Sequence, residues 1–147
     1  MLINLPYGKD AHKTISVPDQ NLLGVLEPPT LTPVADESEA VRAAMAQPIE
    51  SPRLKDLARP GMTVAISISD GSRPNIEKRT MPYVLQELRQ AGIADGDITV
   101  IVGNGSHRPA TDEEIRAMLG DEVDRLKVLN HFSDTSPLVH VGKTPDA

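Results

Sequence analysis

Hydrophobic residues follow two alternating spacings over most of the chain. Stretches with apolar residues at helical spacing alternate with short runs rich in β-branched residues, which are typical of buried strands. The strand-like runs are 62–68, 98–102 and 126–129. Strand, helix and strand in succession, with connections this short, indicate a parallel sheet. The sequence therefore predicts an α/β fold, a Rossmann-like parallel sheet of three or more strands with flanking helices.

Capping residues and prolines mark where the helices are expected to begin and end. Asp36-Glu37-Ser38-Glu39 places carboxylates at the start of one helix, and Pro48 ends it. Ser51-Pro52 predicts an N-cap followed by proline in the first turn of a second helix. Pro82 predicts an interrupted start of a third helix. The run Thr111 to Glu114 has the spacing of a capping box, which predicts the start of a fourth.

The first thirty residues follow a different pattern. Leu2 to Leu5 predicts a short strand that Pro6 ends. Thr14 to Val17 and Leu22 to Leu26 are apolar runs separated by a turn-forming segment, which predicts a small antiparallel β ribbon. Three prolines between residues 27 and 33 indicate an extended linker. We therefore expect residues 1–30 to form a ribbon and linker, and residues 36–147 to form the α/β core.

Composition excludes several classes of function. The net charge of −6 argues against nucleic-acid binding, which needs an excess of lysine and arginine. The absence of cysteine excludes disulfides, thiolate metal sites and a cysteine nucleophile. No apolar run approaches the ~18 residues of a transmembrane helix, and the N-terminus does not resemble a signal peptide. We expect no membrane partner and a cytoplasmic location.

Two polar loops follow successive predicted strands, Ser69 to Pro74 and Gly103 to Pro109. Ligands of open α/β sheets bind beyond the carboxyl ends of the strands, so neighbouring strands would bring these loops to one crevice. Asp70 and Arg73 lie in the first loop, and His107 with Arg108 in the second. Arginine binds carboxylates or phosphates bidentately, histidine exchanges protons near neutral pH, and aspartate orients an imidazole. The two loops together predict an anion-binding α/β domain with a candidate acid–base histidine.

Each of these residues also has a simpler interpretation. A lone arginine after a strand is usually solvated, and Asp70-Gly71 is equally typical of a turn. His131 follows the third strand, where it either reaches the same crevice or serves the fold. His12 and His140 are expected to face solvent. The sequence has neither a histidine pair at metal-site spacing nor a phosphate-binding loop motif, so we predict no metal ligands.

The two loop motifs resemble those of the lactate racemase family. The segment Ser69-Asp70-Gly71-Ser72-Arg73-Pro74 is similar to the family's Ser-Asp-x-Thr-Arg-Pro, and Gly105-Ser106-His107-Arg108-Pro109 to its Gly-x-His-Arg-Pro. The segment Leu5-Pro6-Tyr7-Gly8 also looks familial. Two positions depart from the pattern, because Asn104 and Ser72 stand where the family often has threonine. Asn104 is expected to alter the shape of the pocket.

The resemblance implies a chemistry and a set of roles. Family members interconvert stereoisomers of a 2-hydroxy acid by hydride transfer to a nickel-pincer nucleotide, pyridinium-3,5-bisthiocarboxylic acid mononucleotide nickel. By this resemblance His107 and Asp70 are catalytic, with His107 as acid–base and Asp70 orienting it. The implied substrate-binding residues are Arg73 and Arg108, and the implied cofactor-binding residues are Ser69, Ser72 and Gly105.

The resemblance also implies that more of the protein is needed. Members of the family are longer, and their cofactor-tethering lysine, nickel-binding histidine and second acid–base histidine follow the segment similar to this chain. We therefore expect residues 1–147 to be the single N-terminal α/β domain of a longer racemase-like protein, with the missing C-terminal part as its partner. The isolated domain is expected to bind no cofactor tightly and to be inactive. The alternatives are a non-catalytic module that binds a nucleotide or anion, and an interaction or structural domain.

Overall fold

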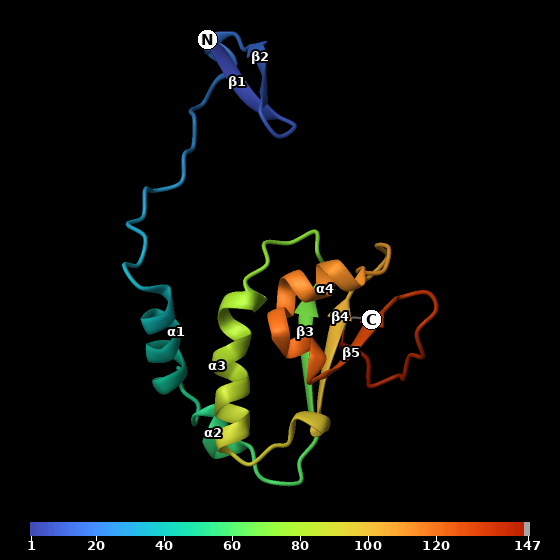
Figure 1. The fold of residues 1–147 in the computed structure, drawn as a ribbon. Coiled ribbons are helices and arrows are strands. Elements are labelled where there is room, and N and C mark those ends of the chain that lie inside the picture. Colours follow the sequence, from blue (N-terminus) through green and yellow to red (C-terminus); the bar gives the residue numbers. More distant parts are fainter. Residues whose placement is uncertain (146–147) are drawn as a thin grey trace. The chain divides into compact units, whose positions relative to one another are not determined.

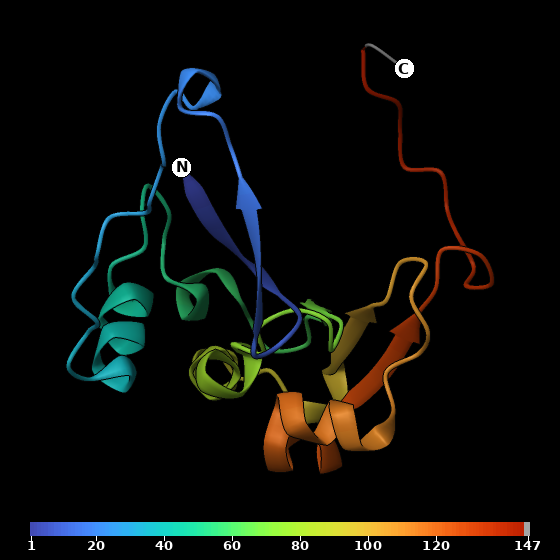
Figure 2. The same ribbon diagram turned by 90° about the horizontal axis from the view of Figure 1, so that it is seen from above.

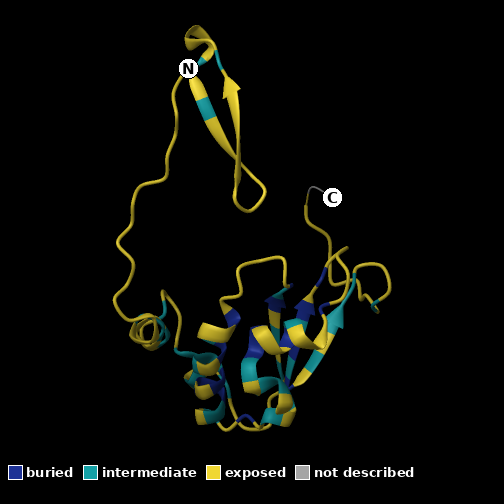
Figure 3. Cartoon of the chain, turned by 45° about the horizontal axis from the view of Figure 1, so that its top comes forward, coloured by how far each residue is buried: buried dark blue, intermediate teal, exposed yellow. Residues whose placement is uncertain are grey.

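A computed structural model describes residues 1–145 of the chain, and its contacts divide the chain into two compact units (Figure 1). The first unit comprises Met1–Pro33, and the second begins at Val34. The first contains a hairpin in which β1 (Leu2–Tyr7) runs antiparallel to β2 (Ala11–Ser16). Most of its residues are exposed, as Figure 3 shows, so this unit has little core of its own.

The predicted N-terminal antiparallel ribbon is confirmed, but the pairing of strands predicted for it is wrong. β2 pairs with β1, and residues 22–26 form no strand. The chain reverses after Tyr7 through Gly8, whose φ of 70° lies in the left-handed region that glycine adopts readily. Pro6 does not end β1 but lies opposite His12. A two-stranded ribbon leaves one edge of each strand unpaired, so a residue without an N–H is accepted there.

The second unit contains a three-stranded parallel sheet in the order β3-β4-β5, which confirms the predicted fold class. Its strands are β3 (Val64–Ser69), β4 (Ile98–Gly103) and β5 (Lys127–His131). Helix α3 (Glu77–Gln90) connects β3 to β4, and α4 (Asp112–Leu119) connects β4 to β5. Both helices cover the same face of the sheet (Figure 2), as right-handed crossovers between consecutive neighbouring strands require.

The remaining helices and 3₁₀ turns are short. They either precede strand β3 or lie in the connections between the strands and helices of the sheet. They are α1 (Glu37–Ala46), α2 (Leu54–Leu57) and the 3₁₀ turns η1 (Asp19–Asn21), η2 (Asp95–Asp97) and η3 (Gly120–Asp124). Helices α1 and α2 both contact α3. No helix in the part of the chain that the structure describes is long and apolar enough to cross a membrane.

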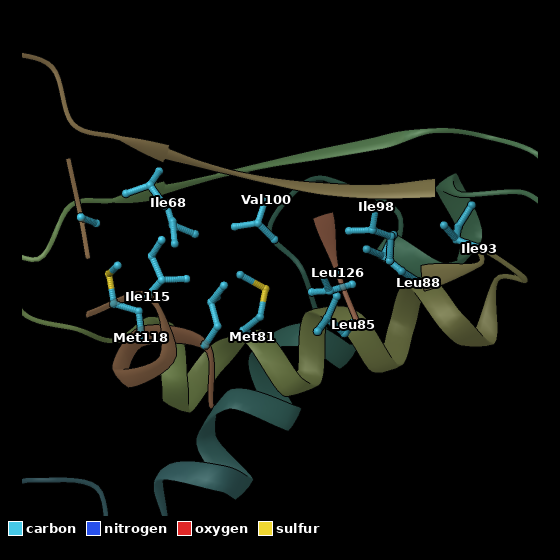
Figure 4. Packing of buried hydrophobic residues seen from close by; sticks show 13 residues of the cluster. Ile68, Met81, Leu85, Leu88, Ile93, Ile98, Val100, Ile115, Met118 and Leu126 are labelled. Carbon is cyan, nitrogen blue, oxygen red and sulfur yellow. The ribbon is translucent and has the colours of Figure 1, made fainter. Parts of the chain in front are cut away.

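The hydrophobic core lies between the sheet and its two covering helices (Figure 4). Alternate residues of β4 point into it, and Ile98, Val100 and Val102 are completely buried. Leu85 and Leu88 of α3 face them, and α4 contributes Ile115, Met118 and Leu119. This packing holds β3, β4 and β5 in register, and thereby fixes where their carboxyl ends lie.

Two predicted helix starts are confirmed and two are wrong. Asp36 Oδ1 accepts a hydrogen bond from the Glu39 N–H at 3.0 Å, and Thr111 forms the predicted capping box of α4. Ser51 caps nothing, because its hydroxyl donates to the Pro52 carbonyl and α2 begins only at Leu54. Pro82 lies inside α3 instead of interrupting its start. Its exposed position lets water satisfy the carbonyl that a proline leaves without a partner.

Candidate functional site

The register of the sheet brings the two polar loops together. Ser69, Gly103 and His131 are neighbours across the sheet at its carboxyl edge, and the loops begin immediately beyond Ser69 and Gly103. There the His107 ring hydrogen-bonds through Nδ1 to Oδ2 of Asp70. An ionised carboxylate only accepts hydrogen bonds, so this contact requires a proton on Nδ1, and in the neutral ring Nε2 is then an acceptor.

Asp70 is held as an anion by hydrogen bonds to both of its carboxylate oxygens. Besides the His107 contact at Oδ2, the Ser72 hydroxyl donates to Oδ1 at 2.7 Å. These two bonds lower the pKa of Asp70, His107 contributing most and Ser72 next, against the opposing effect of burial. The His107 side chain is 55% exposed, whereas that of Asp70 is 11% exposed. The buried carboxylate therefore anchors an imidazole whose other nitrogen is accessible.

Two hollows flank the Asp70–His107 pair. One of them, which we call the Glu114 hollow because Glu114 lines it, has a volume of about 400 Å³. The other, which we call the Arg73 hollow because Arg73 lines it, has a volume of about 270 Å³. Asp70, Asn104 and His107 line both. The Glu114 hollow is completed by Gly71, Ser72, Arg108, Ala110 and Glu114, and the Arg73 hollow by Ser69, Arg73, Gly103, Gly105 and Ser106. The Asp70–His107 pair is thus accessible from two sides.

The two arginines differ in their availability. Arg108 donates to both carboxylate oxygens of Glu114, at 2.8 and 2.6 Å, and to the Pro109 carbonyl. The pair lowers the pKa of Glu114 to about 2, with the Thr111 N–H contributing after Arg108. Within residues 1–145, the Arg73 side chain takes part in no hydrogen bond or ion pair. Arg73 is therefore the arginine with donors left for an added carboxylate.

The three predicted cofactor-binding residues lie around the same edge. The Ser69 hydroxyl donates to Glu77 Oε1 at 2.8 Å, and that of Ser72 to Asp70, so each hydroxyl proton is already used. Gly105 has a φ of 59°, and a Cβ there would enter open space in the Arg73 hollow. Glycine at 105 is thus favoured by the left-handed backbone conformation, and no close neighbour demands it.

At this edge of the sheet there are further polar residues that the sequence either did not single out or whose role it left undecided. His131 ends β5, and its carbonyl accepts from the Asn104 N–H, but its side chain lines neither hollow. Glu114 has the predicted capping role and also binds Arg108, which its helix-start pattern does not reveal. Asn130 bonds to Asn104 and Ala110 without belonging to any motif. A polar residue on the core face of a strand was the available signal for Asn130.

Metal ligands are scarce in this unit. Among the residues described, no group of three or more histidine, cysteine, aspartate or glutamate side chains lies close enough to hold an ion. The volume of the Glu114 hollow falls within the ~300–1,000 Å³ typical of small-molecule sites. The donor set therefore fits a small polar organic ligand and does not by itself fit a nickel ion.

At the carboxyl edge of the parallel sheet of this α/β domain, a buried aspartate thus hydrogen-bonds an accessible histidine. Beside them lies an arginine whose side chain has no hydrogen-bond or ion-pair partner among residues 1–145, and side chains of these types can exchange a proton with an anion and bind it. The chain belongs to the lactate racemase N-terminal domain family, whose profile matches residues 7–147. The family assignment made from the loop motifs is thereby confirmed.

Individual relatives agree with this assignment. The lactate racemase of Lactiplantibacillus plantarum is 33% identical over 97% of this chain. That of Thermoanaerobacterium thermosaccharolyticum is 30% identical over 91% of it. The structure of the lactate racemase apoprotein from T. thermosaccharolyticum matches 89% of this chain with a TM-score of 0.67 and 27% identity. The chain covers 34%, 32% and 30% of these proteins, about a third of their length.

Proposed function

We propose that this chain is the N-terminal domain of a lactate racemase-like isomerase and supplies its acid–base histidine and its carboxylate-binding arginine. The proposed substrate is a small 2-hydroxy acid. The hydrogen bond between His107 and Asp70, at the edge of the sheet and beside Arg73, is the observation that carries this proposal. The remaining two thirds of the length of the relatives is proposed to provide the partner domain.

The arrangement of the site supports a division of roles. Arg73 binds the substrate carboxylate, because its guanidinium donors are available and planar. The substrate hydroxyl then faces Nε2 of His107, which accepts its proton as the carbonyl forms. The ionised Asp70 holds the ring by its Nδ1 side and stabilises the imidazolium. Return of the proton from the same nitrogen re-forms the hydroxyl.

The cofactor of the family is proposed to bind at the same edge, with Ser69, Ser72 and Gly105 around it. When bound there, the nickel-pincer nucleotide would supply the hydride-transfer chemistry at the substrate α-carbon. Because the hydroxyls of Ser69 and Ser72 already donate internally, they meet such a ligand as hydrogen-bond acceptors. Gly105 lines the Arg73 hollow and has no side chain to obstruct such a ligand.

Titration of the chain with lactate by NMR tests the proposed binding site. L-lactate and D-lactate are expected to shift the amide signals of residues 70–74 and 104–109, and to perturb the ring nitrogens of His107. Propionate has the carboxylate without the hydroxyl, so it is expected to shift signals near Arg73 and leave the His107 ring unchanged. Arg73→Ala is expected to abolish both responses.

A matched control replaces an arginine far from the loops. Arg116 on α4 pairs with Asp124 at 3.0 and 2.6 Å, so Arg116→Ala removes a guanidinium without touching either hollow. This variant is expected to bind lactate like the unmodified chain. Lactate shifts that persist in Arg73→Ala, or that map away from the two loops, would contradict the proposal and favour a domain whose loop residues have another purpose.

A further inference from the structure

Two amide side chains join the carboxyl ends of β4 and β5 beneath the His107 loop. Asn104 follows β4 and is 2% exposed, and its Nδ2 donates to Oδ1 of Asn130 on β5 at 3.0 Å. The same nitrogen lies 3.3 Å from the carbonyl oxygens of Val102 and His131. Three acceptors around one nitrogen fix the orientation of the Asn104 amide, because a flipped amide would set oxygen against oxygen.

Asn130 pairs with the backbone of Ala110 on both sides. Its Nδ2 donates to the Ala110 carbonyl at 3.2 Å, and its Oδ1 accepts from the Ala110 N–H at 3.2 Å. The Asn130 side-chain amide thus hydrogen-bonds the N–H and the carbonyl of Ala110 in the way that a backbone peptide group of a neighbouring strand would. Asparagine can do this because its amide carries a donor and an acceptor on one planar group.

The loop that carries His107 is therefore attached to β5 at both ends. At its start, the Asn104 N–H donates to the His131 carbonyl at 3.1 Å, and the Asn104 side chain bonds Asn130. At its end, Ala110 bonds Asn130. His107 lies midway between these attachments, and its ring has Asp70 as its one hydrogen-bond partner within the described chain.

We infer that Asn130 is a positioning residue for His107, which it serves by holding Asn104 and Ala110, the two ends of the 104–110 loop, on β5. The loop needs such attachment because it is exposed over residues 105–109 and contains Gly105 in the left-handed region. Between its ends the loop has few other contacts: the Ser133 N–H and hydroxyl donate to the Gly105 carbonyl, and Arg108 binds Glu114. Without the Asn130 bonds, these contacts and the Asp70 bond have to order the loop against its conformational entropy. The relevance of this inference to catalysis rests on the proposed function of His107. The attachment of the loop to β5 through Asn130 does not depend on that function.

The protein without ligand provides the test, through the ¹⁵N signals of the His107 ring and the backbone order parameters of residues 104–110. Asn130→Leu removes both bonds to Ala110, and Asn130→Asp removes the donor to its carbonyl. Both variants are expected to lower loop order parameters from near ~0.85 to below ~0.6. They are also expected to shift the neutral His107 ring away from the tautomer protonated at Nδ1.

Val128→Ala is the matched control, because Val128 lies on β5, packs against the core and takes no part in the hydrogen bonds of the two amides. It weakens β5 packing but is expected to keep the wild-type tautomer and order parameters. If Asn130→Leu folds and also keeps the wild-type tautomer and order parameters, the remaining contacts of the loop suffice to position the ring and the inference is wrong. If Val128→Ala also loses the wild-type tautomer and order parameters, the changes in the Asn130 variants reflect a general loss of stability, and the inference is likewise wrong.

A measurement on the unmodified chain covers the case in which the Asn130 variants do not fold. The Ala110 N–H donates to a side chain on β5, so its hydrogen exchange is expected to be much slower than that of Ser106 in the same loop. Equal exchange at the two positions would overturn the inference. None of these readouts uses lactate, so failure of the attachment and failure of the proposed function are distinguishable.

Discussion

At the scale of single residues, the contact between Asp70 and His107 makes a direct prediction about the carboxylate. The His107 bond is the largest cause of the lowered pKa of Asp70, and the Ser72 bond is the next. His107→Ala is therefore expected to raise the pKa of Asp70, and Ser72→Ala to raise it by less. A ¹³C NMR titration of the side-chain carboxyls measures both changes.

Asp124 provides the internal control for this titration. Its pKa is lowered mainly by the Arg116 hydrogen bond, which neither substitution touches. The titration curve of Asp124 is expected to be the same in the unmodified chain, in His107→Ala and in Ser72→Ala. An Asp70 curve that stays in place in His107→Ala would show that the two side chains do not interact in solution, and the division of roles proposed above would lose its support.

At the scale of elements, the stability of α4 depends on the hydrogen bonds of its first turn, which directly follows the His107 loop. The Thr111 hydroxyl accepts from the Glu114 N–H at 3.3 Å, and Glu114 Oε2 accepts from the Thr111 N–H at 2.9 Å. Thr111→Ala removes the N-cap and is expected to cost about 1 kcal/mol of stability, within a range of ~0.5–2. Urea denaturation measures it. Thr111→Ser keeps a hydroxyl and is expected to lose little, so equal losses in both variants would exclude the cap as the cause.

Most elements predicted correctly from the sequence have side chains that pack on the core, whereas α1, which buries none of its residues, was predicted from its local Asp36 cap. Strands β3 to β5 and helix α4 have apolar residues at the spacing that burial imposes, and Thr111 caps through purely local contacts. The failures lie in segments without such packing. Residues 22–26 are mostly apolar but form no strand, and Pro82 is exposed and does not stop the helix.

The candidate site was predictable to the level of neighbouring loops and no further. Successive parallel strands place their carboxyl ends together, so the approach of Asp70 to His107 follows from the order of motifs along the chain. The engagement of Arg108 does not follow, because it depends on how the first turn of α4 brings Glu114 back to the loop. The role of Asn130 depends similarly on the β4–β5 register.

At the scale of the whole molecule, one layer of apolar packing holds the second unit together, and its loss has a predictable cost. Leu88 of α3 is 1% exposed within this layer. Leu88→Ala leaves a cavity and is expected to lower the free energy of unfolding by about 2–5 kcal/mol. Leu138, which is 69% exposed, is the matched control, and Leu138→Ala is expected to change it by less than ~0.5 kcal/mol. Urea denaturation of the two variants distinguishes this packing from a loosely collapsed core, in which both substitutions would cost similar amounts.

Stability in acid links the site to the whole fold, because its carboxylates are ionised more readily in the folded chain than in the unfolded one. The pKa of Glu114 falls from an ordinary 4.5 to about 2 through Arg108 first and the Thr111 N–H next, and that of Asp70 is lowered as well. A carboxyl with a lower pKa when folded binds protons preferentially in the unfolded state, so acid favours unfolding. The contribution of Glu114 is complete above pH 4.5 and is lost as the pH falls toward about 2.

The free energy of unfolding is therefore expected to decline across this acid range, and Glu114→Gln is expected to make the decline shallower. Glutamine keeps an acceptor for the Thr111 N–H but carries no charge for Arg108. Because one ion pair is involved, Arg108→Ala is expected to flatten the same part of the curve, and the double variant to add little to either. Urea denaturation at successive pH values tests this. An undiminished slope in Glu114→Gln would mean that Arg108 does not bind Glu114 in solution, and Arg108 would then be as available to a substrate carboxylate as Arg73.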